Sequence, residues 1–110
     1  MLKVRLLGAI IALFALPASA LADDLQTYRL ELKGHKFAPA ELHVSAAKPF
    51  WIVVVNDDDE ADEFEMSAPS LEKMVQPGAE GRVRVRPLAP GRYDFFDDFH
   101  PDAKGAIVAE

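Results

Sequence analysis

The chain has 110 residues, a formal net charge of −6 and no cysteine. This length fits one small domain, and the lack of cysteine excludes disulfides, zinc-thiolate sites, iron-sulfur clusters and blue copper. The excess of acidic residues argues against nucleic acid as a partner, because phosphate binding needs a surface rich in lysine and arginine.

The first 22 residues have the order of a secretory signal peptide. Lys3 and Arg5 precede an apolar run at residues 6–16, and small residues follow it up to Ala22. The run is shorter than the ~20 residues of a membrane-spanning helix. We therefore expect cleavage after residue 22, and a mature domain of residues 23–110 in the periplasm with no membrane insertion.

The mature region predicts an all-β fold, because short segments lie between Pro and Gly turns and no helical periodicity is sustained. Residues 28–32, 41–44 and 82–86 alternate apolar with polar side chains, as strands with one solvated face do. Residues 50–55 are apolar throughout and predict a central strand covered on both faces, with Trp51 in the core. The pattern is typical of a β-sandwich or Greek-key barrel of seven or eight strands.

An acidic segment, residues 57–63, follows the central strand, and six of its seven residues are Asp or Glu. We interpret its start as a solvated loop. An EF-hand is excluded, because Asp62 stands where that loop needs glycine and Ala68 where it needs a bidentate glutamate.

The next segment alternates so that Glu63 and Glu65 share one face of a strand and Phe64 and Met66 share the other. Phe64 and Met66 should face the core. The two glutamates are either hydrated or hold a cation, and their spacing alone favours hydration.

Several other residues allow two interpretations. Met66 and Met74 could bind copper, but core packing is the commoner role of separated methionines. His35 and His43 lack a partner at ligand spacing, which favours solvent exposure. A basic stripe could be a solvated strand face or could dock an acidic partner. The stripe consists of Arg82, Arg84 and Arg86.

The last strand carries an acidic residue at a position that should face inward. If Tyr93 and Phe95 point into the core, then Asp97 has the same parity and its carboxylate arrives at the buried end of the strand. A buried carboxylate needs a backbone donor, a metal or the nearby His100 as a partner. Alternatively the strand ends at Phe96, and Asp97 only caps a turn.

The order of these motifs resembles that of cupredoxin-like domains over nearly the whole mature region. The matching segments are Lys36–Val44, the Lys48-Pro49 turn, the strand ending at Asn56, the Pro77-Gly78 turn, and the strand from Pro90 to Tyr93 with a loop into residues 105–108. The resemblance implies a Greek-key β-sandwich with a metal site at the loop between the Pro90–Tyr93 strand and residues 105–108.

The resemblance also implies an altered ligand set. Asp97 occupies the position of the copper-binding cysteine, His100 that of the following histidine, and Glu63 that of the first copper histidine. Without the thiolate the site is not type 1 blue copper. Glu63, Asp97 and His100, with Glu65 and Asp98 in support, suit iron or Cu(II) better than Cu(I).

The Glu63–Glu65 strand, Glu72-Lys73 and residues 96–101 further resemble periplasmic cupredoxin-like components of bacterial ferrous-iron uptake, relatives of the EfeO-type domain. This resemblance implies an exported accessory that binds iron or copper beside an inner-membrane iron permease and a second periplasmic metal-binding protein. Three alternatives stay open. They are a ferroxidase, a copper-tolerance carrier using Met66 and Met74, and a metal-free protein-interaction module.

Overall fold

The computed structural model describes residues 3, 8, 10–12 and 25–110. The predicted cleavage point after Ala22, and most of the predicted signal peptide, lie outside the described residues. Within the described part, no helix is long and apolar enough to cross a membrane.

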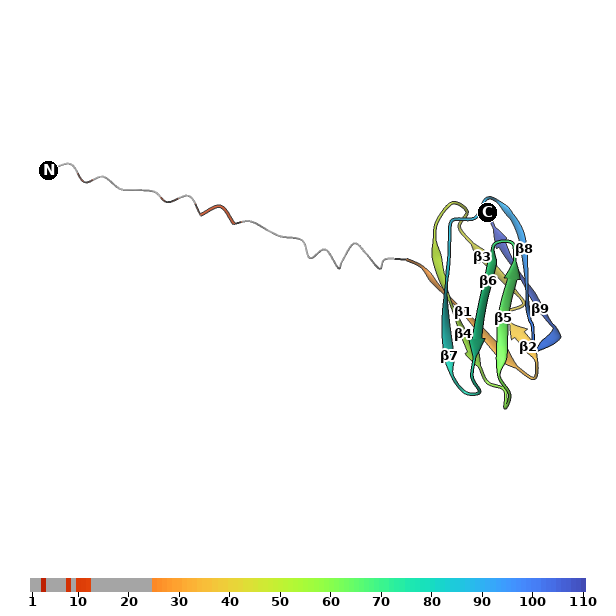
Figure 1. The fold of residues 1–110 in the computed structure, drawn as a ribbon. Coiled ribbons are helices and arrows are strands. Elements are labelled where there is room, and N and C mark those ends of the chain that lie inside the picture. The colour runs from red at the N-terminus through yellow and green to blue at the C-terminus, as the bar shows by residue number, and fades with distance from the viewer. Residues whose placement is uncertain (1–2, 4–7, 9, 13–24) are drawn as a thin grey trace.

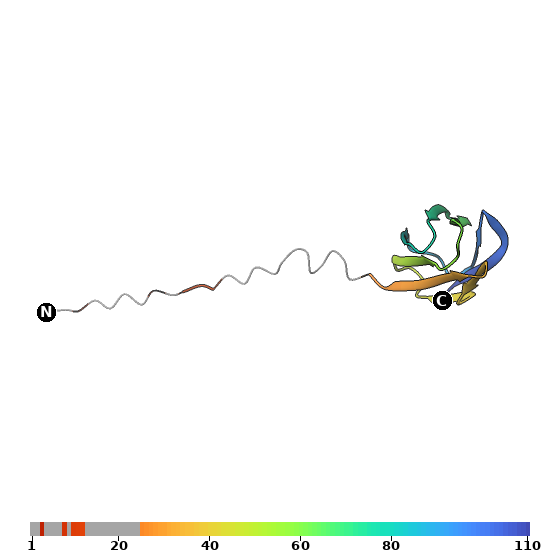
Figure 2. The same cartoon turned by 90° about the horizontal axis from the view of Figure 1, so that it is seen from below.

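Residues 25–110 form an all-β sandwich, as predicted (Figure 1). The strands are β1 (Thr27–Lys33), β2 (Lys36–Ala38), β3 (Glu41–Val44), β4 (Phe50–Asn56), β5 (Asp62–Ser67), β6 (Ser70–Val75), β7 (Glu80–Val85), β8 (Gly91–Asp97) and β9 (His100–Ala109). One sheet has the order β2-β1-β4-β7 and the other the order β3-β9-β8-β5-β6. Figure 2 shows the two layers from below, wrapped around a common interior.

The described strands number nine, against the seven or eight expected. One expectation about the C-terminal region was wrong. We predicted a loop from the end of β8 to residue 105, but β9 already begins at His100 after a two-residue turn, and it pairs antiparallel with β8. Backbone pairing therefore holds the candidate ligand segment in a hairpin.

The core is built from the inward faces of the alternating strands. Leu30 and Leu32 of β1, Ile52 of β4, Phe64 of β5 and Phe95 of β8 are all at most 1% exposed. The parallel pairs β1·β4 and β3·β9 bring together strands that are distant in sequence. The predicted alternation is confirmed, because burying one face of each strand removes its apolar side chains from water.

Trp51 was wrongly assigned to the core. It is half-buried, and the guanidinium of Arg82 lies 4.6 Å from its ring centroid. The neighbours Phe50 and Ile52 point inward instead. A central strand of a two-layer sandwich has only one face in the core, so its alternate residues meet the outer surface.

Candidate metal centre

The acidic loop after β4 is anchored by the buried side chain of Asn56. Its Nδ2 donates to the carbonyl oxygens of Glu60 and Val75 at 2.8 and 2.9 Å, and its Oδ1 accepts from the backbone N–H of Asp58 at 2.8 Å. Asp57 and Asp59 are exposed, as predicted for the start of the loop, whereas the side chain of Asp58 is only 8% exposed. The fixed backbone nevertheless gives the acidic side chains defined positions.

Asp58, which Asn56 positions, fixes in turn the backbone of the turn between β1 and β2. Its carboxylate accepts from the backbone N–H groups of Gly34 at 2.6 Å and His35 at 3.3 Å. His35 has a φ of 55°, in the left-handed region that non-glycine residues seldom adopt. The result is that the imidazole of His35 lies against that of His100, with ring centroids 3.9 Å apart.

Asp97 is fully buried at the end of β8, which confirms the parity argument. Its Oδ1 accepts from the backbone N–H groups of Glu63 at 2.9 Å and Phe99 at 3.0 Å. The bond to Phe99 means that Asp97 also caps the turn. Both interpretations of the sequence therefore apply to Asp97, since its carboxylate faces inward and also caps the turn. Its Oδ2 has no hydrogen-bond partner among the described residues.

Asp62 was missed by the sequence analysis as a candidate ligand. It is the first residue of β5, is fully buried, and neither carboxyl oxygen has a hydrogen-bond partner among the described residues. Burial, followed by the neighbouring carboxyl groups of Asp97 and Asp58, raises the pKa of Asp62 to about 8. Its shared parity with Phe64 and Met66 was the signal that could have revealed it.

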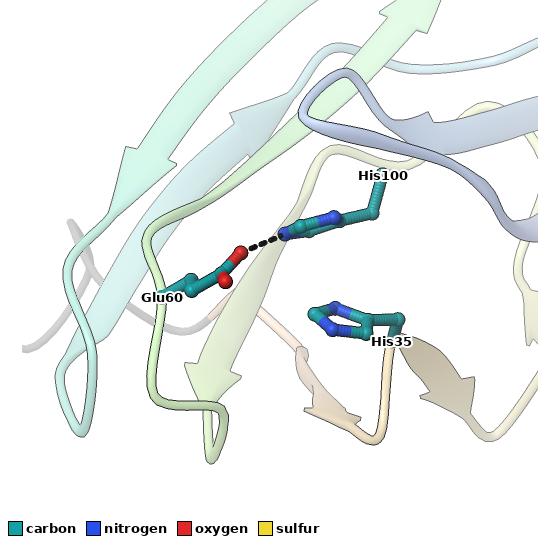
Figure 3. Close-up of side chains that lie close together, drawn as sticks. All are labelled: His35, Glu60 and His100. Atoms are coloured by element: carbon teal, nitrogen blue, oxygen red, sulfur yellow. Dashed lines mark ion pairs between the residues drawn. The ribbon is translucent and has the colours of Figure 1, made fainter.

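His100 lies near both a buried and an exposed carboxylate, and Figure 3 shows its contact with the exposed one, that of Glu60. Its Nε2 lies 3.2 Å from Oε2 of Glu60 and 3.7 Å from Oδ1 of Asp62. Neither contact has hydrogen-bond geometry, so this buried nitrogen has no hydrogen-bond partner within the described residues. Asp62, Asp97 and His100 each offer a ligand atom, and these atoms lie within 4.8 Å of one another.

The five residues predicted as ligands divide between two clusters. Asp97 and His100 lie inside, whereas Glu63, Glu65 and Asp98 form a separate group at the outer surface of β5 and the β8–β9 turn. Glu63 donates its backbone N–H to Asp97, while its carboxylate belongs to the outer group. Successive strand residues point to opposite faces, so Asp62 replaces Glu63 in the inner group.

The outer cluster has its own electrostatics. Partial burial, and then the nearby carboxylates of Glu72 and Asp98, raise the pKa of Glu63. The same causes raise the pKa of Glu65, with Asp98 the larger of the two charges. These groups repel one another, as expected for carboxylates that share a strand face.

The two methionines do not share a face. Met66 is buried in the core, as predicted, but Met74 is 54% exposed. In the β5·β6 register Met74 lies opposite Glu63, whose parity differs from that of Met66. The core assignment of Met74 was therefore wrong, and the pair does not form one soft copper site.

The other open residues lie at the surface. His43 is exposed between Oε1 atoms of Glu41 and Glu110, at 2.9 and 2.8 Å. The basic stripe of Arg82, Arg84 and Arg86 is exposed along β7 and just beyond it, and β7 is an edge strand of its sheet. These residues belong to neither cluster of candidate ligands.

A type 1 copper ion does not fit the residues at this corner. The chain has no cysteine, and the position where the resemblance places the thiolate holds the carboxylate of Asp97. The available donors are carboxylate oxygens and imidazole nitrogens, which suit Fe(II), Mn(II) or Cu(II) better than Cu(I).

Comparisons with known proteins agree with the fold. The sequence profile of the cupredoxin-like domain matches residues 6–109. An uncharacterized protein of Rickettsia prowazekii (strain Madrid E) is 34% identical over 87 residues, which cover 78% of this chain and 70% of that protein.

Two solved structures have similar architecture. The metal binding domain of the Streptococcus pneumoniae D39 Cu(I) exporting P-type ATPase CopA, solved with Cu(I), has a TM-score of 0.69 and 17% identity, covering 80% of this chain and 88% of its own. Auracyanin B has a TM-score of 0.68 and 18% identity, covering 89% of this chain and 93% of its own. At these identities the likeness concerns the fold, and with the matching profile it shows that the chain belongs to the cupredoxin-like domain family.

Proposed function

We propose that this protein binds one transition-metal ion through Asp62, Asp97 and His100 and serves as a metal-binding accessory. The main support is a set of buried polar atoms that have no hydrogen-bond partner in the part of the chain that the structure describes. They are both carboxyl oxygens of Asp62, Oδ2 of Asp97 and Nε2 of His100. Buried polar atoms are normally paired, because an unpaired one loses its hydration without compensation. A cation among them would satisfy all of them together.

A proton alone satisfies this arrangement less well. Burial, and then the neighbouring carboxyl groups, raise the pKa of Asp62 to about 8, so a metal ion has to displace a proton from this site at neutral pH. One proton shared by Asp62 and Asp97 would still leave Nε2 of His100 unpaired. A divalent ion accepts lone pairs from two carboxylates and an imidazole at once.

The donor set favours iron or Cu(II) as the ion. It contains hard oxygens and borderline nitrogen but no sulfur, which disfavours Cu(I). The metal binding domain of the copper exporter contains Cu(I) in the same fold, which supports metal binding at this architecture but not this oxidation state. Since Cu(II) generally binds more tightly than Fe(II), the resident ion also depends on which metal the compartment supplies.

For its cellular role we propose an exported accessory of ferrous-iron uptake. The support is the predicted signal at residues 1–22 and the resemblance of residues 63–65 and 96–101 to iron-linked periplasmic cupredoxin-like proteins. In this role the protein would work beside an inner-membrane iron permease and a second periplasmic metal-binding protein.

The test is the metal content of the protein isolated from its native compartment. We expect about one equivalent of iron or copper, which an Asp62→Asn, Asp97→Asn double variant loses. A Glu63→Gln, Glu65→Gln double variant of the outer cluster is the matched control and should keep the metal. A parent protein that is isolated without metal, and binds none of Fe(II), Mn(II) or Cu(II) in calorimetry, would overturn the proposal.

The proposed cellular role is tested by deleting the gene. The deletion should lower iron accumulation in iron-poor medium, and normal accumulation would contradict the role in iron uptake.

A further inference from the structure

We infer that this corner offers two alternative positions to a single metal ion, an outer capture position and an inner holding position, which share His100 as a ligand. The inference rests on the proposed function and adds a route by which the ion enters. The outer position is formed by His35, Glu60 and His100, and the inner position by Asp62, Asp97 and His100.

The outer residues form a compact set of three ligands at the surface. They come from the β1–β2 turn, the loop after β4 and the first residue of β9, and their ligand atoms lie within 4.8 Å of one another. In Figure 3 the imidazoles of His35 and His100 lie one above the other, with the carboxylate of Glu60 directed at His100. The side chains of His35 and Glu60 are 47% and 69% exposed, so an ion in water reaches them directly.

The inner carboxylates are reached from this outer set. Asp62 and Asp97 are fully buried, whereas the side chain of His100 is 23% exposed. Nε2 of His100 lies 3.2 Å from Glu60 and 3.7 Å from Asp62, so one nitrogen stands between the exposed and the buried carboxylates. An ion held by His100 can exchange Glu60 for Asp62 without being released.

The outer set is held in place by the backbone rather than by chance surface proximity. His35 keeps its left-handed φ of 55° while its N–H donates to Asp58, and Asp58 is positioned in turn by Asn56. Asn56 also donates to the carbonyl of Glu60. The φ values of Gly34, 59°, and His35 are those of a two-residue type I′ turn, which joins β1 to β2 and fixes where His35 leaves the backbone.

The difference between the two ligand sets predicts that the ion moves from the outer position to the inner one. The outer set supplies a single carboxylate, while the inner set supplies two once the entering ion has displaced the proton of Asp62, so the inner position can then neutralise the full charge of a divalent ion. The buried carboxylates also act at a lower effective dielectric constant, which strengthens their attraction for a cation. We therefore expect capture at the surface and tighter holding inside.

The test is stopped-flow binding of Co(II), followed by its visible absorbance, to the full chain. The parent should show a fast phase whose rate rises with Co(II) concentration, followed by a slower phase independent of it. His35→Gln and Glu60→Gln should lower the association and dissociation rates together, by about tenfold, with Kd changed less than about threefold. Asp62→Asn and Asp97→Asn should keep the fast phase, lose the slow one and weaken Kd by more than about tenfold.

Asp59→Asn is the matched control, since it removes one negative charge from the same loop at an exposed residue outside both ligand sets. Comparing Asp59→Asn with Glu60→Gln distinguishes the loss of a negative charge that attracts the cation from the loss of a ligand at Glu60. Circular dichroism of each variant checks that the fold is kept.

The outcomes separate the two proposals. If His35→Gln weakens Kd as much as Asp62→Asn does, all the ligands belong to one composite site, and the two-position inference fails while metal binding stands. Association rates equal to the parent's in both His35→Gln and Glu60→Gln would also overturn it. If the parent binds no Co(II) and no other divalent ion, the proposed function fails as well.

Discussion

Asp97 illustrates how one side chain can serve the fold and the candidate site together. One carboxyl oxygen accepts the N–H of Phe99 in the β8–β9 turn and the N–H of Glu63 in β5, and the other has no hydrogen-bond partner among the described residues. Asp62 has no such structural bonds for either oxygen. The two residues should therefore respond differently to substitution, since Asp97 is needed by the turn and Asp62 only by a bound cation.

Replacing Asp62 with asparagine should stabilise the metal-free protein at neutral pH. The substitution keeps the shape and removes a buried acid whose ionisation is opposed by burial and by Asp97. We expect a gain of about 1 kcal/mol or more, which for a domain of this size raises Tm by roughly 4–8 °C. Calorimetry with EDTA checks this, and the variant should no longer gain stability when Co(II) is added. A lower Tm than the parent in EDTA would contradict the prediction.

His43 should titrate above its ordinary pKa. The hydrogen bond to Glu110 raises the pKa of His43 above 6.5, with Glu41 adding to the effect. Because the folded-state pKa lies above the unfolded one, the protonated imidazole stabilises the fold below about pH 6.5, and this is lost as pH rises through the folded-state pKa. NMR titration of the imidazole protons measures the midpoint, and Glu110→Gln should move it toward 6.5. An unchanged midpoint in that variant would show that Glu110 is not the cause.

At the scale of elements, the candidate site is made where strands end. β4 ends in Asn56, β5 begins with Asp62, β8 ends with Asp97 and β9 begins with His100. Strand ends supply rigid backbone on one side and turn geometry on the other, so side chains there are positioned but can still reach solvent. The hairpin formed by β8 and β9 is what fixes Asp97 relative to His100.

Substituting Asn56 with alanine should weaken both the fold and metal binding. The change leaves the carbonyls of Glu60 and Val75 and the N–H of Asp58 without their partner. We expect a loss of about 2 kcal/mol or more in the free energy of unfolding, measured in urea, because unsatisfied buried groups cost about 1–3 kcal/mol each. Co(II) affinity should fall as Asp58, Glu60 and His35 lose their positions. Ser67→Ala, at an exposed end of β5, is the control, and equal effects of the two changes would contradict this assignment.

At the scale of the whole molecule, the core does not depend on the metal. The apolar cluster runs continuously through both sheets, from Leu30 and Ile52 in one to Phe64 and Phe95 in the other. The candidate ligands Asp62, Asp97 and His100 stand at strand ends and are not members of this apolar cluster. The domain differs in this respect from zinc fingers, which need their ion in order to fold.

Removing the metal with EDTA should therefore leave the β-sandwich folded but less stable. Far-ultraviolet circular dichroism should stay that of a β protein, while Tm falls. Adding back free Co(II) at a hundred times Kd should stabilise the fold by about 2.7 kcal/mol, because the ion binds only the native state. Loss of the β spectrum in EDTA would contradict this prediction and would make the metal part of the folding unit.

The amino-acid sequence by itself determined the all-β class, most of the strands and which way many of their side chains face. Alternation identified Leu30 and Phe64 as core, and it made an inward-facing Asp97 one of two open interpretations. The absence of cysteine already excluded a thiolate-bound copper. These features are local, since they depend only on the two-residue period of a strand.

Only the tertiary structure decided which acidic and imidazole groups meet. It placed Asp62 rather than Glu63 beside Asp97, and it brought His35, which the sequence analysis assigned to solvent, against His100. These contacts join the β1–β2 turn, the loop after β4 and the β8–β9 hairpin. The three segments are far apart along the chain, so the alternation of residues within each one does not indicate that they meet. Strand pairing and the folding of loops at the sandwich end determine such contacts, and a local pattern carries no information about either.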